Sequence, residues 1–120
     1  MKEVTLVLGV SANSGRYANQ LVKRLSDSNR GFIPFGRSKG MIEGVEIEND
    51  WNANWNVDTV SLYIRPDFQK EYFEKIMALA PRRVIFNPGT ENLEFEELLD
   101  KAEISNERAC SLVLLATGVY

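Results

Sequence analysis

Residues 4–18 read VTLVLGVSANSGRYA, and this stretch organises the rest of the chain. An apolar run ends at Gly9, small polar residues follow it, and a helical pattern begins near Tyr17. This order predicts a buried strand, a loop large enough to hold a phosphate, and the N-terminus of a helix. The helix dipole favours an anion at that position, and Arg16 adds a full positive charge beside it.

The composition predicts one globular domain over residues 1–120. The net charge is -3, so the chain lacks the overall basic character that is typical of nucleic-acid-binding domains. No apolar segment approaches the roughly 20 residues of a membrane span, and residues 1–3 lead directly into a strand. We therefore expect a cytoplasmic protein that binds neither nucleic acid nor membrane.

Residue content also limits the chemistry. The chain contains no histidine, which removes the commonest general base and the commonest transition-metal ligand. We expect no metal site and assign no catalytic residue, although carboxylate, lysine or cofactor chemistry stays open. The single cysteine, Cys110, cannot form an internal disulfide, and we expect it to be a small buried hydrophobic residue.

The first half of the chain predicts a βαβ unit. After the first strand, apolar residues recur at helical spacing from Tyr17 to Leu25, and Gly31 is expected to end this helix. Residues 32–35 predict a second strand, which gives a right-handed crossover. Residues 41–48 predict a short edge strand or an extended link.

The second half continues the alternation of strands and helices. Residues 59–64 and 84–86 predict buried parallel strands. A helix is expected to open at Pro66 and to end at Pro81, and a third helix follows the loop 87–92. The second helix is predicted to bury Phe68, Tyr72, Phe73, Ile76 and Leu79, and the third to bury Phe95, Leu98, Leu99 and Ala102.

Two short segments allow more than one interpretation. Trp51 and Trp55 are spaced for one helical turn, and we expect them to pack against the sheet edge rather than to form a partner surface. Residues 111–118 fit either a buried strand or a short helix capped by Ser111 and ended by Gly118. We favour the helix.

These elements predict an α/β domain with an open, mainly parallel sheet and helices on both faces. Ligands of such sheets bind beyond the carboxyl ends of the strands. The loops expected to meet there are 9–16, 36–40, 65–66 and 87–92. Three of these four loops carry a basic residue or accessible backbone N–H groups, which favours an anionic nucleotide as the ligand.

The second of these loops is basic. In dinucleotide-binding folds this position commonly carries an acidic residue that binds the ribose hydroxyls. Here Arg37 and Lys39 occupy the loop, and no carboxylate precedes Glu43. The two cations favour a phosphorylated ribose, and the alternative is that both are simply solvated surface side chains.

The same residues resemble the small single-domain CoA-binding proteins, which are related to the CoA-binding domain of succinyl-CoA synthetase. The similarity spans nearly the whole chain as an ordered set of short pieces. These pieces are Gly9-Val10-Ser11, Arg16-Tyr17-Ala18-Asn19, Phe32-Ile33-Pro34-Phe35, Ile42-Glu43-Gly44, Arg65-Pro66, residues 87–92 and residues 109–113. The chain departs from the family pattern at Gly36-Arg37, where Asn-Pro is usual, and at Asn87-Pro88-Gly89, where glutamine and glycine are usual.

The resemblance implies a three-layer, Rossmann-like domain that holds coenzyme A or an acyl-CoA. The diphosphate would lie at residues 11–16, the adenosine end near residues 35–39, and the pantetheine arm past Arg65 and residues 88–89. If Cys110 lies near the pantetheine end, it could form a mixed disulfide with the CoA thiol. The candidate cofactor-binding residues are Gly9, Val10, Ser11, Asn13, Arg16, Tyr17, Phe35, Gly36, Arg37, Lys39, Arg65, Pro66, Pro88 and Gly89.

Three functions are consistent with these observations. The first is a CoA-binding module without catalysis, which accounts for the phosphate loop, the basic second loop and the absence of histidine. The second is an NADP-dependent or other nucleotide-using enzyme, although residues 9–11 depart from the G-x-G-x-x-G pattern. The third is an interaction or scaffold domain that has lost its ligand. We favour the first, with a small-molecule nucleotide as partner; a protein partner or a homodimer stays open.

Overall fold

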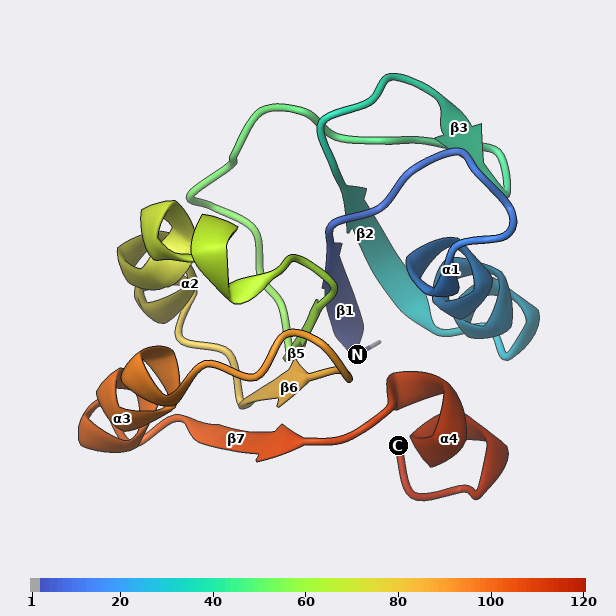
Figure 1. The fold of residues 1–120 in the computed structure, drawn as a ribbon. Coiled ribbons are helices and arrows are strands. Elements are labelled where there is room, and N and C mark those ends of the chain that lie inside the picture. The colour runs from blue at the N-terminus through green and yellow to red at the C-terminus, as the bar shows by residue number, and fades with distance from the viewer. Residues whose placement is uncertain (1–2) are drawn as a thin grey trace.

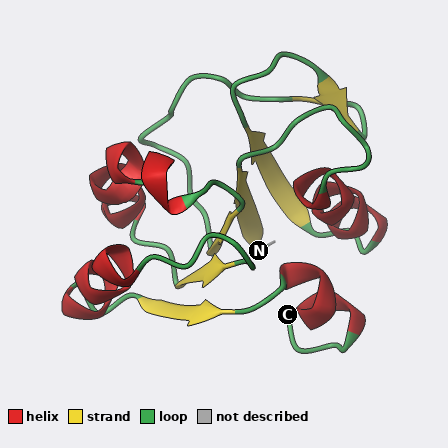
Figure 2. Ribbon diagram, viewed as in Figure 1, coloured by secondary structure: helices red, strands yellow, loops and turns green. Residues whose placement is uncertain are grey.

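The computed structural model describes residues 3–120, which form a five-stranded parallel sheet between two layers of helices (Figures 1 and 2). The sheet contains β1 (Val4–Leu8), β2 (Gly31–Phe35), β5 (Thr59–Leu62), β6 (Arg83–Phe86) and β7 (Ser105–Arg108). One face is covered by α1 (Tyr17–Asp27) and α4 (Ser111–Ala116), and the other by α2 (Phe73–Leu79) and α3 (Leu93–Lys101). The predicted Rossmann-like α/β fold class is confirmed.

The order of the strands creates a crevice at one point of the sheet. The spatial order is β2-β1-β5-β6-β7, so β1 pairs with β2 on one side and with β5 on the other. Leu8, at the end of β1, lies opposite both Phe35 and Leu62. The connections leaving β1 and β5 therefore diverge, and the carboxyl ends of these strands form the switch point where open α/β sheets bind ligands.

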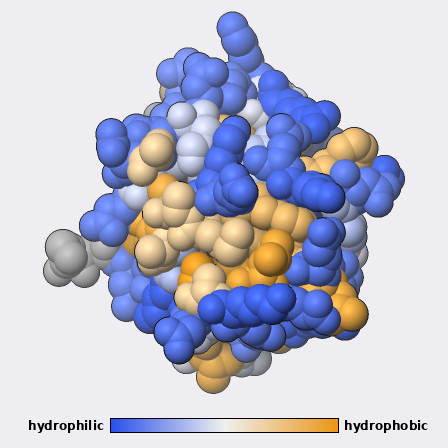
Figure 3. Space-filling model, turned by 90° about the vertical axis from the view of Figure 1, so that its left-hand side faces the viewer, coloured by the Kyte–Doolittle hydropathy of each residue, from blue (hydrophilic) through white to orange (hydrophobic). Residues whose placement is uncertain are grey.

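Each face of the sheet has its own apolar core, because successive side chains of a strand point to opposite faces. Leu6 and Leu8 belong to the core under α2 and α3, whereas Val7 belongs to the core under α1 and α4. Met77 and Leu98 are only partly buried against the first core. The outer face of the α2 and α3 layer shows an apolar area bordered by hydrophilic residues (Figure 3).

The end of α1 corrects one prediction. Asn29, not Gly31, adopts the left-handed conformation beyond this helix, with φ of 57°. Asparagine visits this region more readily than most residues, because its short polar side chain can bond locally. Gly31 instead begins β2. The prediction that Gly31 ends the helix is therefore wrong.

The segment after β5 also differs from the prediction. Two 3₁₀ turns, η1 (Pro66–Phe68) and η2 (Lys70–Tyr72), precede α2 in place of one continuous α-helix. A 3₁₀ turn has three residues rather than 3.6, so the side chains point in different directions. Phe68 is 46% exposed and Gln69 is fully buried. The predicted buried stripe is wrong at Phe68, and a polar residue lies inside the protein next to it.

Residues 41–46 form a hairpin rather than an edge strand of the main sheet. Its strands, β3 (Met41–Ile42) and β4 (Val45–Glu46), are antiparallel and pair with each other. The following loop carries Trp51 and Trp55, which do not form a helical turn. Both indole rings contact the ring of Phe35 edge-on, so the prediction that they pack against the sheet edge is confirmed.

The C-terminal part contains a strand that the sequence did not predict. β7 reads SNER and has no apolar residue, yet it pairs along its length with β6. The predicted short helix is confirmed as α4, although Cys110 rather than Ser111 occupies its N-cap and Cys110 is only partly buried. Ala102, which was expected to face inward, is exposed. Within residues 3–120, no helix has the length and apolarity needed to cross a membrane.

Candidate functional site

A cavity of about 270 Å³ lies at the switch point, above the carboxyl ends of β1, β2 and β5. It is lined by six of the fourteen candidate residues, namely Gly9, Val10, Phe35, Gly36, Arg37 and Arg65. The remaining walls include Tyr63, Phe68 and Tyr72, which the sequence analysis did not identify as site residues. The floor and walls are thus largely apolar or aromatic, and two guanidinium groups supply positive charge.

Two glycines allow the segments that follow β1, β2 and β5 to approach one another. A Cβ atom on Gly36 would overlap the carbonyl oxygen of Val10, and one on Gly9 would lie 3.0 Å from the carbonyl carbon of Tyr63. Gly9 also has a φ of 107°, which other residues rarely adopt. The N–H groups of Gly9 and Val10 both donate to the carbonyl oxygen of Phe35, at 2.9 Å. The cavity therefore depends on close backbone packing between the ends of β1, β2 and β5.

The two arginines of the cavity lie over one aromatic ring. The guanidinium carbons of Arg37 and Arg65 are each 5.4 Å from the centroid of Phe68. Their ion pairs, with Glu71 and Asp67 respectively, are 3.8 Å long and highly exposed. Such pairs contribute little stability, so both cations are available to an incoming anion.

Residues 11–16 form the loop between β1 and α1. Within it, the N–H of Asn13 donates to Ser11 Oγ (3.2 Å) and the N–H of Gly15 donates to Asn13 Oδ1 (2.9 Å). Arg16 is the N-cap of α1, but its side chain makes no capping hydrogen bond, and the first turn contains no acidic residue. Tyr17 follows and is 70% exposed. The positive end of this helix is therefore left uncompensated by the described part of its own chain.

Asn19 supports this loop from inside the protein, although it was not among the candidate residues. Its side chain is 2% exposed, and Nδ2 donates to the carbonyl oxygen of Ser11 at 2.9 Å. Its Oδ1 is buried without a hydrogen-bond partner among residues 3–120. The loop is thus held at its base by a buried amide while its outer side faces solvent.

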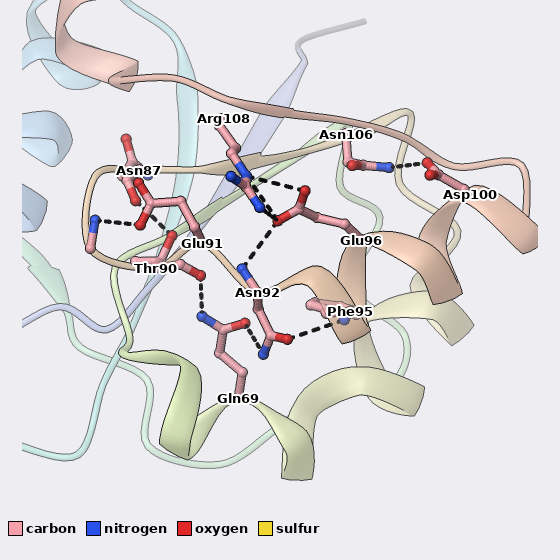
Figure 4. Close-up of polar contacts among 11 residues, drawn as sticks. Gln69, Asn87, Thr90, Glu91, Asn92, Phe95, Glu96, Asp100, Asn106 and Arg108 are labelled. Carbon is pink, nitrogen blue, oxygen red and sulfur yellow. Dashed lines mark hydrogen bonds and ion pairs between the residues drawn. The ribbon is translucent and has the colours of Figure 1, made fainter.

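The loop after β6 differs from the other three. Pro88 and Gly89 are exposed and do not line the cavity. The N–H of Gly89 donates to a carboxylate oxygen of Glu91 at 2.9 Å. Asn92 then caps α3 by accepting from the N–H of Phe95 at 3.2 Å (Figure 4). The N–H groups of Gly89 and Phe95 thus already have acceptors within the chain.

Lys39 and Pro66 also lie outside the cavity wall. Lys39 lines a second, larger hollow of about 690 Å³ together with Glu46, Glu48 and Asp50. Carboxylates at such a site oppose the binding of a phosphorylated ligand. Pro66 begins η1 and supplies no surface to the cavity. The smaller cavity is therefore the better candidate for an anionic ligand.

A buried hydrogen-bond network fixes the strand ends beneath the site. Asn87 Nδ2 donates to Ser61 Oγ and to the carbonyl oxygen of Leu62, both at 2.8 Å. Asn87 Oδ1 accepts from the N–H of Ser111, also at 2.8 Å. This side chain joins β5, β6 and α4, and satisfied buried networks of this kind rigidify a fold.

Tyr63 is a partly buried titratable side chain in the wall of the cavity. The hydroxyl of Tyr63 is buried without a partner in the described part of the chain, and burial raises the pKa of this phenol. Cys110 does not line the cavity. Residues 3–120 contain no group of three or more potential metal ligands placed to hold an ion. The cavity is suited to binding through shape, aromatic contact and positive charge.

The fold and the position of the cavity define a Rossmann-like α/β domain with a site at its switch point. The family described as CoA binding domain matches residues 3–116, and the chain belongs to this family. A comparison with curated proteins found no match.

Solved structures resemble the chain over its whole length. A crystal structure of an uncharacterized protein is 42% identical, with a TM-score of 0.96, and the alignment covers 100% of this chain and 99% of that one. A protein from Thermus thermophilus is 22% identical, with a TM-score of 0.85 and coverage of 99% and 91%. A conserved hypothetical protein from Pyrococcus furiosus is 22% identical, with a TM-score of 0.78 and coverage of 94% and 98%. The last two support the fold alone.

Proposed function

We propose that this protein binds coenzyme A or an acyl-CoA at the switch point and performs no chemistry on it. The observation that carries the proposal is the cavity walled by Arg37 and Arg65, in a member of the CoA-binding family. The loop that continues from its lining residue Val10 leads to the uncapped N-terminus of α1. Anions bind at helix N-termini because the backbone N–H groups and the helix dipole both favour negative charge.

In this proposal each part of the ligand has its own place. The diphosphate binds at residues 11–16, where Arg16 adds charge to the helix dipole. The adenosine end occupies the cavity beside Phe35. Pockets that enclose a whole drug-sized ligand measure about 300–1,000 Å³, so a cavity of about 270 Å³ is large enough for only a part of CoA. Arg37 pairs with the phosphate on the ribose, and the pantetheine arm runs past Arg65 toward residues 88–89.

The absence of a chemical step rests on the groups beside the cavity. The chain has no histidine, and the carboxylates of Glu71 and Asp67, which lie 3.8 Å from the two arginines, are highly exposed and do not line the cavity. General acid–base catalysis needs a positioned group whose pKa lies near the operating pH. We therefore propose a protein that holds its ligand rather than converts it.

Calorimetric titration of the purified protein with CoA tests this proposal. We expect one CoA per chain, and weaker binding of 3′-dephospho-CoA by about tenfold, because a charge-assisted contact with Arg37 is lost. Thermal unfolding gives a second measure, since ligand at about 100 times its Kd stabilises by about 2.7 kcal/mol. Trp51 provides an internal fluorescence reporter, because its ring lies 5.8 Å from that of Tyr72 in the cavity wall.

NADPH is the control ligand in both measurements. Binding of NADPH without binding of CoA would favour a nucleotide-using enzyme over the proposed module. If millimolar CoA and acetyl-CoA produce neither heat nor a shift in unfolding temperature, the proposed function is wrong.

A further inference from the structure

Gln69 is a fully buried polar residue between two exposed neighbours, Phe68 and Lys70. Its carboxamide makes three hydrogen bonds to other segments of the chain. Figure 4 shows those with Thr90 and Asn92. Nε2 donates to the carbonyl oxygens of Ile64 at 2.9 Å and Thr90 at 2.7 Å. Oε1 accepts from Asn92 Nδ2 at 3.1 Å. Both hydrogens of the amide nitrogen and one side of its oxygen are thereby used.

These contacts tie one segment to three fixed points. Ile64 follows β5, Thr90 lies in the loop after β6, and Asn92 is the N-cap of α3. Thr90 is itself held, because its N–H and its hydroxyl both donate to the carbonyl oxygen of Asn87, at 3.0 and 2.7 Å. Gln69 thus sets the position of the two 3₁₀ turns relative to the strand ends.

The same two turns carry one wall of the cavity. Phe68 directly precedes Gln69, and the N–H of Tyr72 donates to the Gln69 carbonyl oxygen at 2.8 Å. Phe68 and Tyr72 line the cavity, whereas Gln69 does not. Arg37 and Arg65 both lie over the Phe68 ring, so a displacement of this ring also displaces the cations.

We infer that Gln69 is a positioning residue for the ligand site. Its hydrogen bonds hold Phe68 and Tyr72 where their side chains can contact the adenosine end of the ligand. This inference rests on the proposed function. Glutamine suits the position because the surroundings offer two acceptors and one donor. A methionine would leave the carbonyls of Ile64 and Thr90 without this donor, and a glutamate would place a negative charge against both.

The test compares Gln69→Met with Leu99→Ala. Leu99 is fully buried in α3 and does not line the cavity, so its truncation lowers stability while the hydrogen bonds of Gln69 stay intact. The probes are CoA and adenosine 3′,5′-bisphosphate, which carries only the adenosine end. We expect Gln69→Met to weaken both by about tenfold, because the Phe68–Tyr72 wall is then no longer fixed before the ligand binds. Leu99→Ala lowers the unfolding temperature and leaves both affinities unchanged.

Hydrogen exchange of residues 64–73 supplies a readout that does not require a ligand. Exchange in this segment rises in Gln69→Met without ligand and stays at the wild-type level in Leu99→Ala. If Gln69→Met does not fold, Asn92→Asp replaces it, because aspartate still caps α3 but presents no N–H to Gln69. This variant weakens binding by about threefold, in keeping with the loss of a single contact.

The outcomes separate the two hypotheses. If the wild type binds neither probe, the proposed function is wrong, and hydrogen exchange alone then tests whether Gln69 positions the wall. Unchanged exchange of residues 64–73 in Gln69→Met overturns the inference. If the wild type binds and Gln69→Met binds both probes equally well, the inference is wrong while the proposed function stands.

Discussion

The N-termini of α1 and α3 occupy equivalent places in the fold but differ in how the chain treats them. Each helix follows a parallel strand and a short loop at the carboxyl edge of the sheet. At α3, Asn92 caps the helix, the Asn92 N–H donates to Glu96 at 3.1 Å, and acidic residues lie in the first turn. At α1, no side chain caps the helix and Arg16 takes the place of an acid.

This contrast shows which helix N-terminus is available to a ligand. Carboxylates of the chain supply the negative charge that the α3 dipole favours, and Glu96 in turn pairs with Arg108 at 3.0 Å (Figure 4). The α1 terminus lacks an equivalent charge, and the loop that precedes it starts at Val10, which lines the cavity. An unfilled cap costs stability, so its retention at the end of this loop is consistent with a site for an external anion.

The largest effect is expected when α1 is given the chemistry of α3. Arg16→Asp places an N-cap acid on an extended residue (φ −81°, ψ 143°), which should stabilise the fold by about 1 kcal/mol. The same change should weaken CoA binding by about 100-fold, because a carboxylate replaces a cation beside the diphosphate. Calorimetry and thermal unfolding measure the two effects.

The matched control is Arg24→Asp, which makes the same charge change in the last turn of the same helix. It should lower stability, because an acid opposes the dipole at a C-terminus, and should leave CoA affinity unchanged. Equal loss of affinity in both variants would mean that long-range charge, rather than the α1 N-terminus, controls binding.

A smaller effect is expected from removing the caps themselves. Asn92→Ala should destabilise the protein by about 1–2 kcal/mol, because the Phe95 N–H loses its acceptor at the helix cap and Gln69 Oε1 loses its donor. Arg16→Ala removes no capping hydrogen bond and should change stability by less than about 0.5 kcal/mol. Urea unfolding of the two variants measures the difference. Equal destabilisation would show that the Arg16 side chain stabilises the fold as much as the Asn92 cap does and would remove the contrast between the helices.

The smallest effect concerns an ion pair at the opposite, amino edge of the sheet. Asp58 accepts from Arg82 at 2.8 and 3.0 Å, and this guanidinium holds the pKa of Asp58 below its usual range. A lowered pKa stabilises the fold above the unfolded value of about 3.9, and the contribution is lost as the pH falls through the folded pKa. Asp58→Asn should therefore cost about 1 kcal/mol at pH 7 and progressively less below about pH 4.

Urea unfolding of the wild type and of Asp58→Asn between about pH 2.5 and pH 7 measures how the stability contribution of Asp58 is lost on acidification, because this range spans the carboxylate pKa. The CoA affinity of the variant at pH 7 is the control. An unchanged affinity in Asp58→Asn would support the view that polar contacts far from the two helix N-termini serve stability alone. A stability difference that persists at the acid end would contradict the role of the Asp58 charge.

The parts of the fold that were predictable are those coded by local patterns. The apolar run before Gly9 and the helical spacing after Tyr17 identify β1, its loop and α1, because strand and helix periods are visible in one short window. β7 was missed because an edge strand without apolar residues carries no such period and forms through pairing with β6. The Phe68 error arose because α-helical and 3₁₀ spacing cannot be distinguished in three residues.

The positive charge of the candidate site could be predicted from the sequence, but which loops line the cavity could be predicted only in part. Arg37 and Arg65 were recognised from their places after strands, and they do meet over one cavity. Pro88 and Gly89 also follow a strand, but β6 lies one strand further from β1, so their loop does not reach the cavity wall. Strand order is a property of the whole sheet and is not written in any single loop.

Local sequence thus established that the chain alternates strands and helices and that α1 begins with a cation and no acid, because such features depend on neighbouring residues. Tertiary packing selected the loops that share a site, turned Phe68 outward and Gln69 inward, and paired Glu96 at the α3 terminus with Arg108 of β7. These outcomes depend on contacts between residues far apart in sequence, where burial and hydrogen-bond satisfaction override local preference.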